Sequence, residues 1–600
     1  MKHAFITIIA AAITLPLAAQ DSAYVRNVTV ERDYQPTIQE AQKIQTQPQV
    51  VEETMTPVEV KYSDYSNILS PVHNVTPMGM PKTSFKSSGQ YNGYIRGGFG
   101  HTGTLLDFEY ALKDQKSSTL NVYAHHRAEW GLRTLSKSNL GLDYTHSFQR
   151  SDLYFGVKGG NLFYHKYGRI YDYQNGDNYL REIGLDNKID KTALWTAEAF
   201  VGVKSNKSKS DFKYRFQTGY ALYSKIGTVT EHQVRTSAQV DWKTDVHHVG
   251  GNLYVQNNMI QLGSLSNDIT EEEKNKVHNI RIEPYYEYQG KRIIVHAGVN
   301  MDVNIGRGKM LSGSDNISFL PSPNIYMEAQ VAKQWLTLYA SARGSFGVGN
   351  LQSFMESNRY RLIHAGVVST HVTSYSPIDA ELGLHIRPTM NLMIELHGGY
   401  GLLYNQCSLI ATTEDGAATQ KRFGKSMNAG AFGYAYSDYG RGKIGGIFDY
   451  HYRDMVHVKA WGDYYIWRSF GHEAPGYTFT NPAVQLDSAT VYDRPSWKVG
   501  LRIDGRIDSH WSLYSDNRFE GARTVMATDG EHTLAPMINL GLGCKYEMAV
   551  GKKVVTRGER QMPNLELFLQ LDNIMHRHND IYYGYQTQGI QFLLGALYRF

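Results

Sequence analysis

The stretch "IIVHAGVNMDVNI", residues 293–305, decides the fold. Its odd-numbered positions share an apolar side chain: Ile293, Val295, Ala297, Val299, Met301, Val303 and Ile305. Polar residues alternate with them: His296, Asn300, Asp302 and Asn304. Because successive side chains of a β-strand point to opposite faces, this period of two predicts a strand with one apolar and one polar face.

The same alternation recurs along the chain from about Tyr91. It is clear in the stretches "FKYRFQTGYAL" (212–222), "VRTSAQVDWK" (234–243), "WKVGLRIDGRID" (497–508) and "LELFLQLD" (565–572). Turn-forming residues separate such stretches: "GKR" (290–292), "DYGRGK" (438–443) and "TDGE" (528–531). The pattern predicts about 22 strands in the part of the chain that follows Tyr91.

A soluble β-sandwich and a transmembrane β-barrel would both alternate in this way. The stretches reach the length of about 9–11 residues that a tilted strand needs to cross a bilayer. Their polar faces carry opposite charges in close register, as in Arg502, Asp504 and Arg506. Closure into a barrel also pairs every backbone group internally, which hydrocarbon requires. The sequence therefore predicts an all-β transmembrane antiparallel barrel over residues 89–600, with apolar faces toward outer-membrane lipids.

The first 88 residues differ from the rest. Residues 1–20 are typical of a cleaved signal peptide, because Lys2 precedes the apolar run "AFITIIAAAITLPLAA" and a cut after Ala19 or Gln20. Residues 21–88 are rich in proline and predict an extended, poorly ordered periplasmic segment. Within them, "VRNVTVERDY" (25–34) has the alternation of a short strand that could add to a partner. We expect this docking segment to act through Val28, Val30 and Tyr34.

The C-terminal segments "LELFLQLDNI" (565–574) and "IYYGYQTQGIQFLLGALYRF" (581–600) resemble the barrel end of TonB-dependent receptors. In that family an apolar strand with an Asp-Asn pair precedes a Tyr-rich loop, and the last strand ends in an aromatic residue. "NVTVERDY" (27–34) is loosely similar to the TonB box. The family also has a globular plug of well over a hundred residues before the barrel. Only about 60 residues are available for it here, so the chain resembles a plug-less relative.

The resemblance implies a Gram-negative outer-membrane protein that acts in solute uptake or as a receptor or channel. Two alternatives remain. One is a filled barrel that docks a periplasmic or lipoprotein partner through its N-terminal segment, and the other is a degenerate TonB-linked transporter. The resemblance further implies that the outer-membrane insertion machinery recognises the last strand. Phe592, Tyr598 and Phe600 are the residues expected to carry this signal and to close the barrel against residues 91–100.

The sequence predicts no enzyme, no cofactor and no nucleic-acid partner. With 61 basic and 57 acidic residues, the chain lacks the large excess of positive charge that is typical of nucleic-acid-binding proteins. "GFGHTG" (98–103) and "GRGKIG" (440–445) match a dinucleotide fingerprint in spacing, but we expect their glycines to serve turns between strands. His576, His578 and Asp580 could hold a metal on one face of an extended segment. No third firm ligand is identifiable, so we expect polar turn residues and no metal site.

Overall fold

The computed structural model describes residues 92–600 with internal gaps. The gaps are 114–116, 132–133, 166–190, 207–210, 226–228, 263–275, 307–316, 333–334, 354–359, 361–373, 412–431, 454, 474–486, 528–529, 551–553, 557–558 and 562–563. The expected signal peptide and the docking residues Val28, Val30 and Tyr34 lie outside the described residues. Among the residues that are described, no helix has the length and hydropathy needed to cross a membrane.

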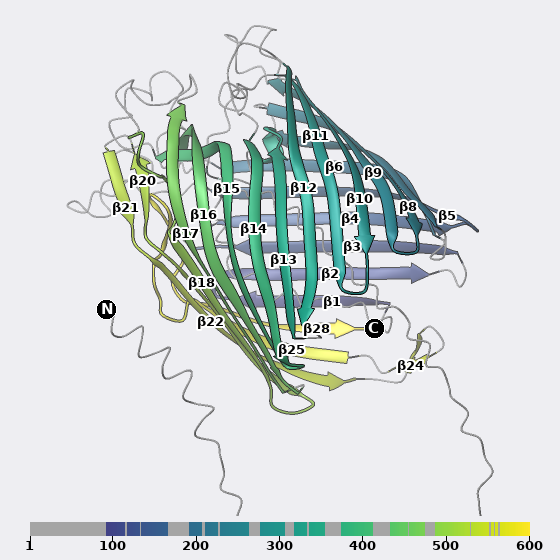
Figure 1. Ribbon diagram of the computed structural model, residues 1–600. Helices are drawn as coiled ribbons and strands as arrows, with labels where there is room; N and C mark the ends of the chain where they lie inside the picture. Colours follow the sequence, from purple (N-terminus) through teal and green to yellow (C-terminus); the bar gives the residue numbers. More distant parts are fainter. Residues whose placement is uncertain are drawn as a thin grey trace, which may run out of the picture. The chain divides into compact units, whose positions relative to one another are not determined.

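A closed antiparallel barrel of 22 strands forms the fold, as predicted (Figure 1). Its strands are β1 (Gly93–Gly100), β2 (Gly103–Lys113), β3 (Ser118–Glu129), β4 (Leu135–Ser147), β5 (Ser151–His165), β6 (Lys191–Ser205), β7 (Phe212–Lys225), β8 (Val229–Thr244), β9 (His247–Leu262), β10 (Lys276–Gln289), β11 (Ile293–Gly306), β12 (Ile317–Ala332), β13 (Leu336–Gly347), β14 (Ser374–Thr389), β15 (Leu392–Ala411), β16 (Phe432–Tyr452), β17 (Val456–Glu473), β18 (Trp497–Arg506), β19 (Trp511–Glu520), β22 (Met537–Ala549), β25 (Asn564–Asp572) and β28 (Gln591–Arg599).

Three short hairpins lie within the connections between these strands. They are formed by β20 (Arg523–Ala527) with β21 (Gly530–Leu534), β23 (Val554–Thr556) with β24 (Glu559–Gln561), and β26 (Asp580–Tyr582) with β27 (Tyr585–Gln586).

The first and last strands close the barrel. β28 pairs with β1 from Tyr94↔Arg599 to Gly100↔Leu593, and its other edge pairs with β25. In Figure 1, the yellow β28 lies beside the purple β1. Because neither strand keeps a free edge, the backbone donors and acceptors of the seam are paired inside the sheet.

The two faces of β11 confirm the alternation seen in its sequence. Ile293 and Val299 are 48% and 46% exposed on the outer face, whereas Asp302 and Asn304 are buried on the inner face. Other strands show the same arrangement. The most exposed apolar side chains of the wall include Leu382, Ile444, Leu140, Leu594 and Phe319. The outer surface is therefore apolar and the lumen is lined by polar groups, as a barrel in lipid requires.

Strand direction places the long connections together, except for 550–563, which lies at the same end as the short turns. Successive strands are antiparallel, so alternate connections lie at opposite ends of the barrel. One end has the short turns 245–246, 290–292, 333–335, 390–391, 453–455 and 507–510. The other end has the longer connections 166–190, 263–275, 307–316, 348–373, 412–431, 474–496, 521–536 and 573–590. In outer-membrane barrels the long loops face outward and the short turns face the periplasm.

Both ends of the described chain lie at the short-turn end. The backbone N–H of Asn92 donates to the carbonyl of Phe600 at 2.8 Å, and Phe600 donates back to Gly93 at 3.0 Å. The start of β1 and the end of β28 are therefore joined by backbone hydrogen bonds at this end.

One predicted turn is wrong. "GFGHTG" does contain a turn, since β1 ends at Gly100 and β2 begins at Gly103, but "GRGKIG" and the overlapping "DYGRGK" (438–443) lie inside β16. There the glycines make room for neighbouring side chains: a Cβ atom on Gly440 would meet the Tyr400 hydroxyl, and one on Gly445 would lie 2.6 Å from His397 Nε2. Glycine in a strand interior often marks such a close approach, which short-range patterns do not separate from a turn.

Candidate functional site

A network of charged and polar side chains covers the inner wall from β13 to β17. We call it the lumenal network, and it comprises Tyr339, Asp379, Glu381, Glu395, His397, Arg441, Lys443 and Asp463. Its members lie on the polar faces of their strands, opposite outward residues such as Leu382 and Ile444. The alternation of each strand therefore produces this wall.

Ion pairs between strands hold one half of the lumenal network. Arg441 donates to Asp379 at 2.6 Å, and Lys443 donates to Glu381 at 2.9 Å. The Tyr339 hydroxyl lies 2.9 Å from a carboxylate oxygen of both Glu381 and Glu395. The two ion pairs and the Tyr339–Glu395 contact each join strands that are not direct neighbours, so the network stiffens the wall across several strands.

A histidine between two carboxylates forms the other half. His397 Nε2 lies 2.8 Å from Asp463, and its Nδ1 lies 3.4 Å from Glu395. The His397 side chain is only 6% exposed. Charged groups that are already paired in this way resist reorganisation, so they present a fixed polar surface to whatever enters the lumen.

Removing the Tyr339 hydroxyl tests the strength of the lumenal network. Tyr339→Phe keeps the ring but leaves Glu381 and Glu395 without their common donor. Because a hydrogen bond to a charged group contributes about 1.5–3 kcal/mol, we expect a loss of that size in unfolding free energy. Thermal unfolding in detergent measures it. Tyr286→Phe is the matched control, since that hydroxyl contacts His247 on the exposed outer face, and an equal loss in both variants would contradict the prediction.

A second feature occupies the lumen at the long-connection end. We call it the loop cap, and it comprises 348–353, Tyr360, 487–495, the β20–β21 hairpin and 573–588. Part of the β13–β14 connection lies on the inner wall at β8. Glu231 of β8 accepts the backbone N–H of Leu351 at 2.8 Å and that of Gln352 at 3.3 Å. Leu351 is 1% exposed and Glu231 is fully buried, so this contact is part of the interior.

The local sequence explains why residues 350–353 form a turn that can dock in this way. Residues 351–353 make one helical turn, and Asn350 accepts the backbone N–H of Ser353 at 2.7 Å. Asparagine is a favoured N-cap residue because its side-chain oxygen satisfies a donor of the first turn. Glu231 accepts the next free donors, so the turn is capped jointly by its own sequence and by the barrel wall.

Tyrosines join two connections within the loop cap. The rings of Tyr360 and Tyr585 stack at 4.2 Å, and Tyr360 also contacts Tyr164 and Tyr582 edge-on at 6.1 and 6.2 Å. All four side chains are buried. The β13–β14 and β25–β28 connections therefore meet at Tyr360, against the inner side of β5.

The rest of the loop cap is attached to β15. β20 pairs in parallel with the end of β15 at Ile410↔Met526 and Ala411↔Ala527. Arg523 donates to the carbonyl of Asp580 at 2.9 Å, which ties β20 to the β25–β28 connection. Asp493 accepts the backbone N–H of Leu409 at 2.8 Å.

Burial of the Asp493 segment perturbs its titration. Burial raises the pKa of the Asp493 carboxyl and lowers the pKa of the neighbouring Arg494 guanidinium. The Arg494 guanidinium lies over the rings of Tyr439 and Trp467 at 5.7 and 5.8 Å. Stacking on these rings compensates part of the cost of removing the charge from water.

Sequence reasoning did not predict the loop cap. The available signal was the density of tyrosine and apolar residues within loops, such as "IYYGY" at 581–585. The partners of these residues lie far away in the chain, and no local period reveals them.

The histidines considered for a metal have other contacts. His576 Nδ1 accepts the backbone N–H of Ile590 at 3.0 Å, and His578 Nδ1 lies 3.2 Å from the carbonyl of Thr587. Asp580 accepts a hydrogen bond from Gln586 at 3.2 Å. Among the described residues, these three side chains do not converge on one point.

The aromatic residues of the C-terminus lie along the barrel seam. Phe592 is 44% exposed on the outer face, and the rings of Tyr598 and Phe600 stack at 5.7 Å. Phe600 also stacks on Tyr110 of β2 at 5.8 Å. Their recognition by the insertion machinery stays a prediction.

Comparison with known proteins gives the fold a context. No protein-family model and no curated protein sequence matches the chain. Solved structures are similar. The FrpB iron transporter from Neisseria meningitidis aligns with a TM-score of 0.59 and 9% identity, covering 85% of this chain and 81% of that chain. The ferric enterobactin receptor PfeA from Pseudomonas aeruginosa gives 0.57 and 11%, covering 85% and 80%.

The ferric-catecholate import receptor Fiu from Escherichia coli K12 gives a TM-score of 0.57 and 9% identity, covering 85% of this chain and 82% of that chain. At such low identities the likeness shows the fold alone. The chain is a β-barrel whose architecture is similar to that of TonB-dependent receptors.

Proposed function

We propose that the chain acts in solute uptake or as a receptor across the outer membrane, with the lumen as the route. The observation that carries this proposal is a polar lumen whose outer mouth contains segments of the chain's own long connections. A wide lumen without such segments would suit free diffusion, whereas a loop cap held by a few defined contacts can be displaced by a ligand. The names of the similar structures, which are receptors and transporters, support the same class of function.

The proposal extends to export and to partners. The signal peptide at residues 1–20 would direct the chain to the periplasm of a Gram-negative cell, where the insertion machinery would recognise the last strand. Residues 21–88 would then hang from the periplasmic end of the barrel. From there Val28, Val30 and Tyr34 would add as a strand to TonB or to another periplasmic or lipoprotein partner.

The loop cap also favours a second candidate function. A barrel that is permanently filled at one end would suit an interaction or assembly component, which would need its N-terminal segment but not its lumen. The two candidates differ in whether ions can cross the barrel.

Planar-bilayer conductance of the purified protein, with and without residues 21–88, separates the candidates. We expect infrequent conductance steps from both forms, because the lumen is polar and the loop cap consists of connections that can move out of the mouth. Steps only after truncation would assign the closure to the N-terminal segment. Silence in both forms, with a partner that co-purifies only when residues 21–60 are present, would overturn the uptake proposal and support the assembly component.

A further inference from the structure

Two histidines and a carboxylate converge on the inner wall at the short-turn end. Asp449 and His451 are two residues apart on β16, so they share its inner face. His457 lies on β17 directly opposite His451 in the strand register. Only residues 453–455 separate the two strands, so the turn itself brings the histidines together.

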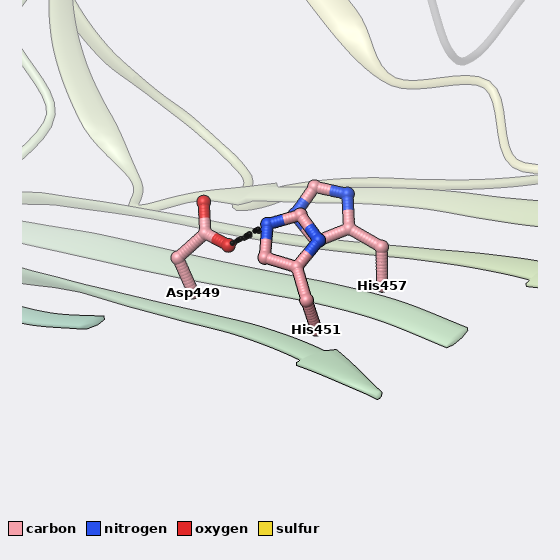
Figure 2. Close-up of side chains that lie close together, drawn as sticks. All are labelled: Asp449, His451 and His457. Carbon is pink, nitrogen blue, oxygen red and sulfur yellow. Dashed lines mark hydrogen bonds and ion pairs between the residues drawn. The ribbon is translucent and has the colours of Figure 1, made fainter. Parts of the chain in front are cut away.

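Figure 2 shows the Asp449 carboxylate beside the overlapping imidazole rings of His451 and His457. Asp449 Oδ1 lies 2.9 Å from His451 Nε2 and 3.0 Å from His457 Nε2. The two imidazole rings are stacked with centroids 3.9 Å apart and an interplanar angle of 8°. One ligand atom from each of the three residues lies within 4.8 Å of the other two.

This set has the chemistry of a transition-metal site. Imidazole nitrogen with carboxylate oxygen suits Zn²⁺ and its neighbours in the first transition row, whereas Ca²⁺ and Mg²⁺ prefer oxygen ligands. With metal–ligand bonds of about 2.0–2.2 Å, the ligand atoms of a tetrahedral site lie about 3.3 Å apart. The two distances from Asp449 to the histidines are a few tenths shorter, and binding of an ion would also require the stacked imidazole rings to rotate toward it.

A second carboxylate lies behind one of the histidines. Asp504 of β18 is paired with His457 in the strand register, and its Oδ2 lies 3.9 Å from His457 Nδ1. Arg502 holds Asp504 through two hydrogen bonds of 2.7 and 2.8 Å. A carboxylate at the far nitrogen of a metal-binding histidine sets its tautomer and orientation. Asp504 lies near this nitrogen, and a small movement of its carboxylate would bring it within hydrogen-bond distance.

We propose that Asp449, His451 and His457 form a binding site for one divalent transition-metal ion of the Zn²⁺ class. The three side chains supply three ligands, and the fourth position belongs to water from the lumen, because His451 is 54% exposed. The site lies where β16 and β17 reach the periplasmic rim. Asp504 acts as a positioning residue. The inference concerns the rim alone and does not depend on the solute that the barrel carries.

Zinc titration of the purified full-length protein in detergent, after treatment with a chelator, tests the site. We expect one tight equivalent of Zn²⁺, and Co²⁺ in its place should give the visible absorption of a tetrahedral complex. His451→Ala with His457→Ala should remove this equivalent. Asp504→Asn should weaken binding about 10–100-fold, as loss of an outer carboxylate does.

Two further variants keep the test decisive. Asp449→Asn is nearly isosteric and should abolish the Co²⁺ absorption even if the double histidine variant does not fold. His578→Ala is the matched control, since that exposed histidine contacts the Thr587 carbonyl outside the cluster, and it should bind as the unchanged protein does. The proposal is overturned if the unchanged protein binds no tight equivalent, or if Asp449→Asn and the double variant bind it with unchanged affinity.

Discussion

Replacing Glu231 with alanine is expected to release the turn at 350–353 from the barrel wall. The carboxylate accepts the backbone N–H groups of Leu351 and Gln352 inside the lumen, so alanine at this position removes both hydrogen bonds. Loss of these bonds should lower the free energy of lifting the turn by about 2 kcal/mol. The population of the lifted turn should therefore rise about 30-fold.

Amide hydrogen exchange in the peptide that contains Leu351 and Gln352 measures this opening. Glu231→Gln should have a smaller effect, since its amide oxygen can still accept one bond. Glu328→Ala is the matched control, because Glu328 contacts Tyr326 on the β12 wall and not the loop cap. If exchange at 350–353 stays unchanged in Glu231→Ala, the loop cap is not held by Glu231. More frequent conductance steps in this variant would support its role as a gate.

Replacing Gly595 with alanine is expected to damage the seam of the barrel. A Cβ atom at this position would meet the backbone carbonyl of Gly97 and lie 2.8 Å from the Cα atom of Gly98, both on β1. Backbone atoms cannot rotate away as side chains do, so β28 would have to separate from β1. Overpacking of this kind costs about 1–3 kcal/mol, and more where the backbone itself must move.

The matched control for the seam is Gly97→Ala on the partner strand. A Cβ atom there would meet nothing within 4 Å, so the same chemical change should leave the barrel intact. The measurement is the fraction of protein that migrates as a folded barrel on an unheated gel, followed by the temperature at which that form is lost. Equal behaviour of the two variants would mean that the close approach at Gly595 does not limit closure.

The barrel itself could be predicted from the sequence because its signal is local. In β11 the residue faces follow from the period of two alone, and the buried Asp302 and Asn304 lie where the alternation placed them. A strand in lipid must show an apolar face to hydrocarbon along its whole length, so every strand repeats the alternation of apolar and polar residues. The number of such alternating stretches also predicted the approximate number of strands.

Turns were less predictable than strands. Glycine serves a tight turn at Gly100 and Gly103 but makes room for packed side chains at Gly440 and Gly445. The local sequence is similar in the two cases. Only the neighbouring strands decide between them, since they bring the Tyr400 and His397 side chains against the backbone.

The functional features depend on contacts between distant segments. The backbone N–H of Leu351 donates to Glu231, which lies 120 positions away in the chain. The ring of Tyr360 stacks on that of Tyr585, which belongs to another connection. The histidine cluster is an intermediate case. Asp449, His451 and His457 are close in sequence, yet sequence reasoning considered other histidines, because only the strand register shows that His451 and His457 share a face.

The sequence was enough to predict a closed barrel with an apolar exterior and a polar lumen, because the side chains of each strand alternate between an apolar face and a polar face. The tertiary structure alone decided which polar groups meet inside and which connections enter the mouth. These contacts depend on strand register and barrel closure, which bring together side chains that are far apart in the chain. Such contacts produce no periodic pattern in the sequence.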